Sequence, residues 1–76
     1  MESFGGRLRE ARHRKVWRQE DLSATSGVAV VTISRLESGH GEMPRQSTVR
    51  KLADALSVDP EWLLFGETEW EGKDAA

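Results

Sequence analysis

The chain has 76 residues and no cysteine, so it can form only one small domain and has neither disulfides nor thiolate ligands for a metal. It contains no apolar run of about 18 residues and no secretory leader, so we expect a soluble, cytoplasmic protein. Residues 1–51 carry ten Lys or Arg against six Asp or Glu, a charge of +4, whereas residues 52–76 carry one against seven, a charge of −6. This asymmetry indicates either a polyanionic partner for the first part or solvated surface with an acidic tail.

Apolar residues recur at spacings of three and four, and no stretch alternates with a period of two, which predicts an all-α protein. The first helix is expected over residues 4–15. The second is expected over residues 19–26, where Gly27 supplies the left-handed residue that ends a helix. The apolar positions that define these two helices are Phe4, Leu8, Ala11 and Leu22.

The third helix is expected over residues 29–38, because Ala29, Ile33 and Leu36 have helical spacing and Gly39 follows them. These three apolar side chains are expected to face the core. The outward face of the third helix would then carry Val30, Val31, Ser34 and Arg35.

The fourth helix is expected over residues 46–56 and the fifth over residues 60–65. Asp59 can cap the fifth helix, Pro60 suits its first position, and Gly66 ends it.

Only about three residues join the second and third helices, which forces a steep crossing and presents the third helix outward. This is the helix-turn-helix arrangement, whose second helix fits the major groove of DNA.

Four segments in register resemble the phage-repressor-like (Cro or XRE-type) helix-turn-helix family: LREAR (8–12), QEDLSATSGV (19–28), TISRLESG (32–39) and VRKLADALSVDPEWLL (49–64). The resemblance implies a five-helix, lambda-repressor-like bundle and a transcriptional regulator that binds pseudo-palindromic double-stranded DNA as a homodimer. We expect the helix-turn-helix domain to span residues 1–66, and the acidic segment 67–76 to be a mobile tail.

The resemblance also implies roles for individual residues. Gln19 matches a phosphate contact, and Arg12 with Glu37 matches a structural ion pair. Base contacts are expected from the recognition helix, namely from Val30, Val31, Thr32, Ser34 and Arg35, of which Ser34 is included for its outward position. Further candidates for phosphate contact, taken from charge and position, are Arg18, Arg45, Ser47 and Arg50.

Arg35 can pair with guanine, whereas Val30 and Val31 can only pack on thymine methyl groups or seat a partner protein. Five positions depart from the family pattern, two of which are Val30 and Val31, where polar contacts are common. Arg18 and Ala29 stand where capping hydroxyls are common, and Val16 stands where glycine commonly ends the first helix, which implies a different turn or strain.

Trp17 is expected to pack between the first two helices. The apolar residues of the fifth helix cannot all face inward, so they form either a homodimer interface or a lid over the core; the candidates are Val58, Trp62, Leu64 and Phe65.

His13 and His40 lack neighbours at metal-ligand spacing, and no nucleophile or phosphate loop stands out, so we expect no cofactor, no metal and no enzyme. The rival to a DNA-binding regulator is a protein-interaction module, antitoxin-like or an accessory subunit, with the same fold.

Overall fold

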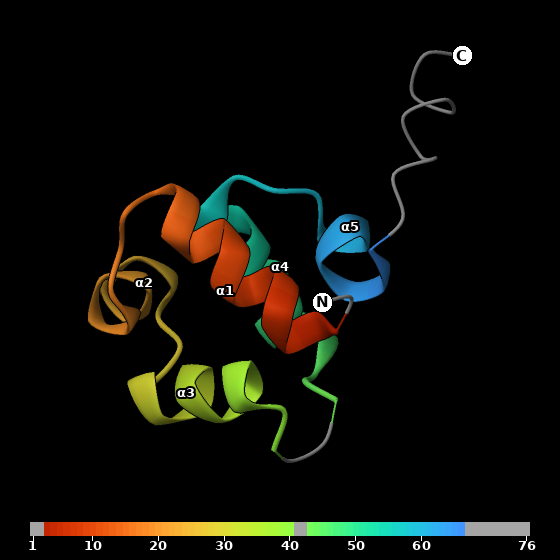
Figure 1. Ribbon diagram of the computed structural model, residues 1–76, viewed down its shortest axis with the longest axis horizontal. Helices are drawn as coiled ribbons and strands as arrows, with labels where there is room; N and C mark the ends of the chain where they lie inside the picture. The colour runs from red at the N-terminus through yellow and green to blue at the C-terminus, as the bar shows by residue number, and fades with distance from the viewer. Residues whose placement is uncertain (1–2, 41–42, 67–76) are drawn as a thin grey trace.

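The computed structural model describes residues 3–40 and 43–66, so the expected tail over 67–76 lies outside the described residues. The described residues form helices and no strands, which confirms the expected all-α bundle. In Figure 1, α3 runs along the lower edge of the bundle, with α2 at one side and α5 at the other. The helices are α1 (Phe4–Arg14), α2 (Gln19–Ser26), α3 (Val30–Ser38), α4 (Gln46–Leu56) and α5 (Pro60–Phe65).

Polar caps and glycines mark where several helices begin and end. The backbone N–H of Gly6 donates to the hydroxyl oxygen of Ser3 at 3.0 Å, and that of Glu61 donates to the carboxylate of Asp59 at 2.7 Å. These bonds satisfy donors in the first turns of α1 and α5. Three helices are followed by a glycine in the left-handed conformation; these are Gly27, Gly39 and Gly66.

The turn after α1 is closed by a valine rather than a glycine. Val16 has a φ of 58°, which a β-branched residue rarely adopts. Its N–H donates to the carbonyl of His13 at 2.9 Å, and the N–H of Trp17 donates to that of Arg12 at 3.2 Å. These two bonds form the usual glycine-ended helix terminus, so the turn itself is unchanged and Val16 is strained within it.

The hydrophobic core receives side chains from all the helices. α1 packs against α3 and α5, while α4 packs against α2 and α5. Trp17 is partly buried and packs against the core, and the ammonium group of Lys15 lies 5.2 Å from the centroid of the Trp17 ring. Among the described helices, none is long and apolar enough to cross a membrane. The buried apolar residues are Leu8, Ala11, Leu22, Val28, Ile33, Val49, Leu52, Ala53, Leu56 and Leu63.

Arg7 fixes α5 against α1. Its guanidinium group is buried and donates hydrogen bonds from Nε to the carbonyl of Leu63 at 2.9 Å and from Nη2 to that of Leu64 at 2.8 Å. A cation is favourable at this position because the last carbonyls of a helix have no partner within the helix and carry partial negative charge. Arg7 therefore joins two segments that are far apart in the sequence.

Candidate nucleic-acid interface

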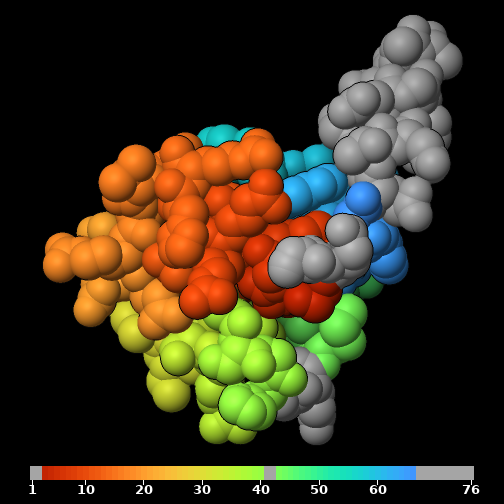
Figure 2. Space-filling model, viewed as in Figure 1, coloured from red at the N-terminus to blue at the C-terminus, as the bar shows by residue number. Residues whose placement is uncertain are grey.

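The turn between α2 and α3 rests on buried apolar residues. Gly27 adopts a φ of 82° and donates its N–H to the carbonyl of Ser23 at 2.9 Å, which ends α2. Val28 is buried directly after it, and Ile33 is fully buried on the inner side of α3. These anchors hold α3 against the core, so that its other side faces solvent along the lower margin of the molecule (Figure 2).

The exposed face of α3 begins one residue earlier than the sequence predicts. Ala29 was expected to face the core, but this prediction is wrong: Ala29 is the exposed N-cap residue, and Val28 occupies the buried position. The error arises because Ala29 precedes the first helical residue, so that the spacing of α3 does not extend back to it. Val30 and Val31 are 37% and 63% exposed.

Polar and charged side chains follow the two valines along α3. Arg35 is exposed and lies one turn after Val31, while Ser34 lies one turn after Val30 and is half-buried. Thr32 is also half-buried, on the opposite flank of the helix from Ser34. The hydroxyl of Ser38 donates to the carbonyl of Ser34 at 2.9 Å, so its hydrogen atom is used within the helix.

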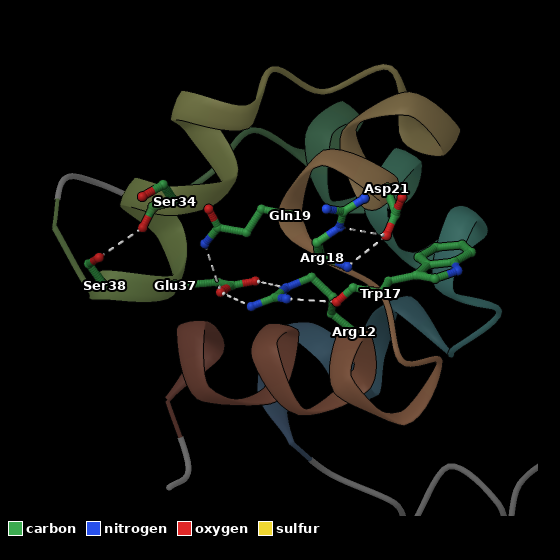
Figure 3. Close-up of polar contacts among 8 residues, drawn as sticks. All are labelled: Arg12, Trp17, Arg18, Gln19, Asp21, Ser34, Glu37 and Ser38. Carbon is green, nitrogen blue, oxygen red and sulfur yellow. Dashed lines mark hydrogen bonds and ion pairs between the residues drawn. The ribbon is translucent and has the colours of Figure 1, made fainter.

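A bidentate ion pair joins α1 to α3 beneath this face. Arg12 donates from Nε and Nη2 to the two carboxylate oxygens of Glu37, each at 2.7 Å. The side chains of the pair are 9% and 5% exposed. Arg12 also donates from Nη1 to the carbonyl of Trp17 at 2.8 Å, and Gln19 donates from Nε2 to Glu37 at 3.1 Å. Figure 3 shows that α1, α2 and α3 meet at this network.

The ion pair sets the charge of α3. Burial alone would raise the pKa of Glu37, but the hydrogen bonds from Arg12 and Gln19, together with the positive charges of Arg12 and Arg9, hold that pKa below its ordinary value. The same hydrogen bond raises the pKa of Arg12. Glu37 is the only acidic residue within Val30–Ser38, and its charge is neutralised by Arg12. Arg35 therefore leaves the exposed face of α3 positively charged.

The candidates for phosphate contact lie at the starts of two helices. Arg18 is the N-cap of α2, and its side chain has no acceptor atom; instead its backbone N–H donates to the carboxylate of Asp21 at 2.8 Å, and its Nε lies 3.8 Å from the same carboxylate. Gln19, the first residue of α2, is half-buried and uses its amide on Glu37. At α4, the exposed candidates are the N-cap Arg45, together with Ser47 and Arg50.

The apolar residues of α5 divide between the core and the surface. Leu63 is fully buried, although the sequence analysis did not single it out, and Phe65 is 62% exposed. Phe65 lines a groove of about 250 Å³ between α4 and α5, together with the apolar residues Val49, Pro60 and Leu64 and the polar residues Gln46, Arg50 and Glu61. The remaining candidates are partly buried and pack against the core; these are Val58, Trp62 and Leu64.

Comparison with protein families decides the classification. The helix-turn-helix family matches residues 8–63, which include most of α1 and all of α2, α3 and α4. The chain belongs to the helix-turn-helix family. The resemblance inferred from the four sequence segments is thereby confirmed.

Individual helix-turn-helix proteins share both sequence and fold with this chain. The HTH-type transcriptional repressor RghR of Bacillus subtilis (strain 168) is 40% identical over 65 residues, which are 86% of this chain and 48% of RghR. This chain thus spans about half the length of that relative. RghR is named as an HTH-type transcriptional repressor.

Two solved structures show the same arrangement of helices. The P22 c2 repressor in complex with a synthetic operator is 33% identical, with a TM-score of 0.80 over 88% of this chain and 100% of that chain. The SinR–SinI protein complex contains a chain that is 25% identical, with a TM-score of 0.79 over 95% of this chain and 75% of that chain. The expected repressor-like bundle is therefore confirmed.

Proposed function

We propose that this chain is a sequence-specific DNA-binding regulator of transcription, with α3 in the major groove. The observation that carries the proposal is the exposed face of α3, on which Arg35 makes no ion pair with a described residue while Glu37, the only carboxylate of α3, is neutralised by Arg12. A positively charged helix on a rigid support suits a polyanion with a groove. The likeness to the P22 c2 repressor, which was solved with an operator, supports the same function.

The side chains of α3 differ in what they can recognise. Arg35 can donate two hydrogen bonds to O6 and N7 of guanine, a contact that discriminates against other bases by about 1 to 3 kcal/mol. Ser34 and Thr32 can each form a single hydrogen bond to a base or to an adjoining phosphate. Val30 and Val31 have no polar atom in their side chains and can contact only apolar groups on a base.

Phosphate contacts would position the domain without distinguishing sequence. Arg45 and Ser47, with Arg50 one turn beyond, present donors at the start of α4, and Arg18 does so at the start of α2. Gln19 has one amide hydrogen directed at Glu37, which fixes its orientation and leaves its other amide hydrogen for a phosphate oxygen.

The α5 surface supports a homodimer. Phe65 is exposed and lines the groove between α4 and α5, whose other lining residues are partly apolar, and exposed aromatic residues are enriched at interfaces. Val58, Trp62 and Leu64 would form the margin of that interface while they cover the core. Sedimentation of the wild type and of Phe65→Ser tests this step, because the variant should be monomeric at concentrations where the wild type is a dimer.

A second function is supported by Val30 and Val31, whose exposed methyl groups could seat another protein. A chain of similar fold was solved within the SinR–SinI protein complex. This chain would then be an interaction module with little affinity for DNA. Salt separates the two functions, since DNA affinity falls steeply with salt concentration, whereas an apolar protein contact hardly changes.

The decisive experiment is selection of the purified chain against a library of random DNA duplexes at near-physiological salt. The proposal predicts enrichment of a two-fold symmetric motif whose half-sites lie about one helical turn apart. Arg35→Ala, run in parallel, should lose or relax that motif while its circular dichroism spectrum stays that of the wild type. Failure of the wild type to enrich any sequence would support the interaction module instead.

A further inference from the structure

The outward face of α1, which forms the middle of the surface seen in Figure 2, carries an open groove with a net positive charge. The groove has a volume of about 490 Å³, and α1 supplies all of its described lining residues. Glu10 pairs with Arg14 at 2.9 Å. The exposed side chains of Arg9 and His13 make no hydrogen bond or ion pair with a described residue. The described lining residues are Gly6, Arg9, Glu10, His13 and Arg14.

Glu37 of α3 does not take up the donors of Arg9. The two charges are close enough to interact, but both carboxylate oxygens of Glu37 accept hydrogen bonds from Arg12, each at 2.7 Å. The guanidinium of Arg9 carries five N–H donors and a permanent charge, and the imidazole of His13 has at least one N–H donor in either protonation state. The groove on α1 can therefore bind further carboxylates.

We propose that the acidic segment 67–71 (ETEWE) docks in this groove, with Glu69 and Glu71 at Arg9 and His13. The segment contains three carboxylates and no cation. It belongs to the acidic part of the chain, whose charge neither the fold nor the proposed function uses. The described lining of the groove does not include α3, so the inference goes beyond DNA binding and does not depend on it.

The described chain ends beside the groove. Arg7 holds the end of α5 through the carbonyls of Leu63 and Leu64. Gly66 follows α5 and lies so close to Arg7 that a Cβ atom at position 66 would be 2.8 Å from Nη1 of the guanidinium. Gly6, the first lining residue, is the neighbour of Arg7 in the chain. Segment 67–71 thus begins at one end of the groove and, when extended, spans about 17 Å, which exceeds the length of about 12 Å that nine helical residues cover.

The spacing of the carboxylates matches the spacing of their partners. Alternate residues of an extended chain point to the same side and lie about 6.6 Å apart, so Glu67, Glu69 and Glu71 would share one side of segment 67–71. Arg9 and His13 are four residues apart on α1, a rise of about 6 Å, and share one side of the helix. Two successive carboxylates can therefore reach both side chains at the same time.

The covalent connection makes a weak contact sufficient. Exposed ion pairs contribute little individually. A short tether, however, holds a segment at an effective concentration in the millimolar range near its site. Segment 67–71 follows Gly66 directly, so the ordering of long intervening chain is not needed. Because the contact is electrostatic and exposed, it should be sensitive to salt.

A second groove near the end of α5 is a poorer site for this segment. Phe65 lines the groove between α4 and α5, so that groove is also within reach of residues 67–71. The charged side chains among its described lining residues are Arg50 and Glu61, which have opposite signs. A segment with three carboxylates therefore finds net attraction on α1 and little at the α4–α5 groove.

The test places a nitroxide spin label on the full chain and records the amide NMR signals of the described residues. The sequence has no cysteine, so Gly72→Cys introduces a unique attachment site directly after Glu71. Docking predicts that the signals of residues 9–14 lose intensity, whereas those of residues 46–50 at the start of α4 do not. In about 1 M salt the Debye length falls to about 3 Å, and the lost intensity should return.

Charge variants assign the effect to the named side chains. The double substitution Glu69→Gln and Glu71→Gln preserves the size of both side chains and should restore the signals of residues 9–14. Arg9→Gln should restore them as well. Arg50→Gln is the matched control, because it removes an exposed arginine that lines the other groove, and it should leave the loss of intensity unchanged. The NMR spectra themselves verify that each variant is folded.

Three results would overturn the inference. The first is full intensity for residues 9–14 in the spin-labelled chain, or a loss that is strongest at residues 46–50. The second is a loss that persists in both glutamine variants or in high salt. The third is an equal loss in a mixture of isotope-labelled chains without nitroxide and unlabelled chains that carry it, since a second copy would then occupy the groove. None of these experiments contains DNA, so their failure leaves the proposed function to be decided by the selection experiment.

Discussion

Gly5 of α1 lies against the backbone of α3 at Leu36. A Cβ atom at position 5 would overlap the carbonyl oxygen of Leu36 and come within 3.0 Å of that of Glu37. Both obstacles are backbone atoms, which cannot rotate away as the end of a side chain can. The approach of α1 to α3, and with it the Arg12–Glu37 ion pair, therefore depends on glycine at this position.

Gly5→Ala should destabilise the fold, although alanine is the better helix former by about 1 kcal/mol. We expect a net loss of about 1 to 3 kcal/mol, the usual cost of overpacking a tight contact. Urea unfolding measures this loss in the free energy of unfolding. Ala24→Gly, at an exposed position of α2, provides the matched comparison, because there glycine should be the less stable residue. A Gly5→Ala variant more stable than the wild type would contradict the close approach.

Val16→Gly should stabilise the fold. The left-handed conformation at φ 58° costs a residue with a side chain about 1 to 2 kcal/mol, and glycine removes this cost. Part of the resulting stabilisation is offset because glycine has greater freedom in the unfolded chain. Urea unfolding should show a net increase of about 1 kcal/mol in the free energy of unfolding. The side chain is 89% exposed, so little packing is lost. If Val16→Gly unfolds at a lower urea concentration than Val16→Ala, the turn is not strained.

Glu37→Gln should destabilise the fold most at neutral pH. It leaves the buried guanidinium of Arg12 without its counter-ion, which typically costs about 3 to 5 kcal/mol. The pKa of Glu37 is lowered in the folded chain, so the unfolded chain binds the additional proton. The stabilisation is complete above the ordinary glutamate pKa of about 4.3 and is lost as the pH falls through the lowered folded value.

The difference in stability between the wild type and Glu37→Gln should therefore shrink on acidification. Urea unfolding at neutral pH and below the ordinary glutamate pKa measures this. Glu10→Gln is the control, because Glu10 pairs with Arg14 on the exposed surface of α1 at 2.9 Å, where such pairs contribute little. A difference for Glu37→Gln that is the same at both pH values would refute the assigned role of the carboxylate charge.

Ala29→Ser should raise stability and weaken DNA binding. The serine hydroxyl can accept a hydrogen bond in the first turn of α3, which stabilises a helix by about 1 kcal/mol. The same hydroxyl makes the exposed start of α3 polar beside Val30, a proposed base contact, so affinity for the selected duplex should fall. Ala24→Ser, in the interior of α2, should give no such stabilisation. Equal stability of Ala29→Ser and the wild type would show that α3 needs no polar cap.

Local sequence signals predicted most of the fold. The apolar spacing and the cap at Asp59 gave the helices to within one residue, since both act within a turn or two. Ala29 was misassigned because apolar spacing alone cannot distinguish the first helical residue from the cap before it. Val28 was expected to fill the gap beneath the turn, and it is buried there.

Contacts between distant segments could not be predicted in the same way. Arg7 resembles any surface arginine in the sequence, and its carbonyl acceptors at Leu63 and Leu64 become visible only when α1 and α5 pack together. Gly5 lies within a helix rather than in a turn, so only its contact with α3 explains why glycine is required there. The resemblance to a known family suggested the pairing of Arg12 with Glu37, but not the hydrogen bond of Gln19 to that pair.

The measurement that tests the account most directly compares the dissociation constants of the wild type, Arg35→Ala and Arg50→Ala on the selected operator and on a random duplex. Arg35→Ala should weaken operator binding by about 5- to 150-fold, the loss of a bidentate base contact, and weaken binding to the random duplex much less, because only a positive charge is lost there. Arg50→Ala should weaken both alike and lower the salt slope by about 1. If Arg35→Ala binds both duplexes as the wild type does, α3 is not the recognition helix.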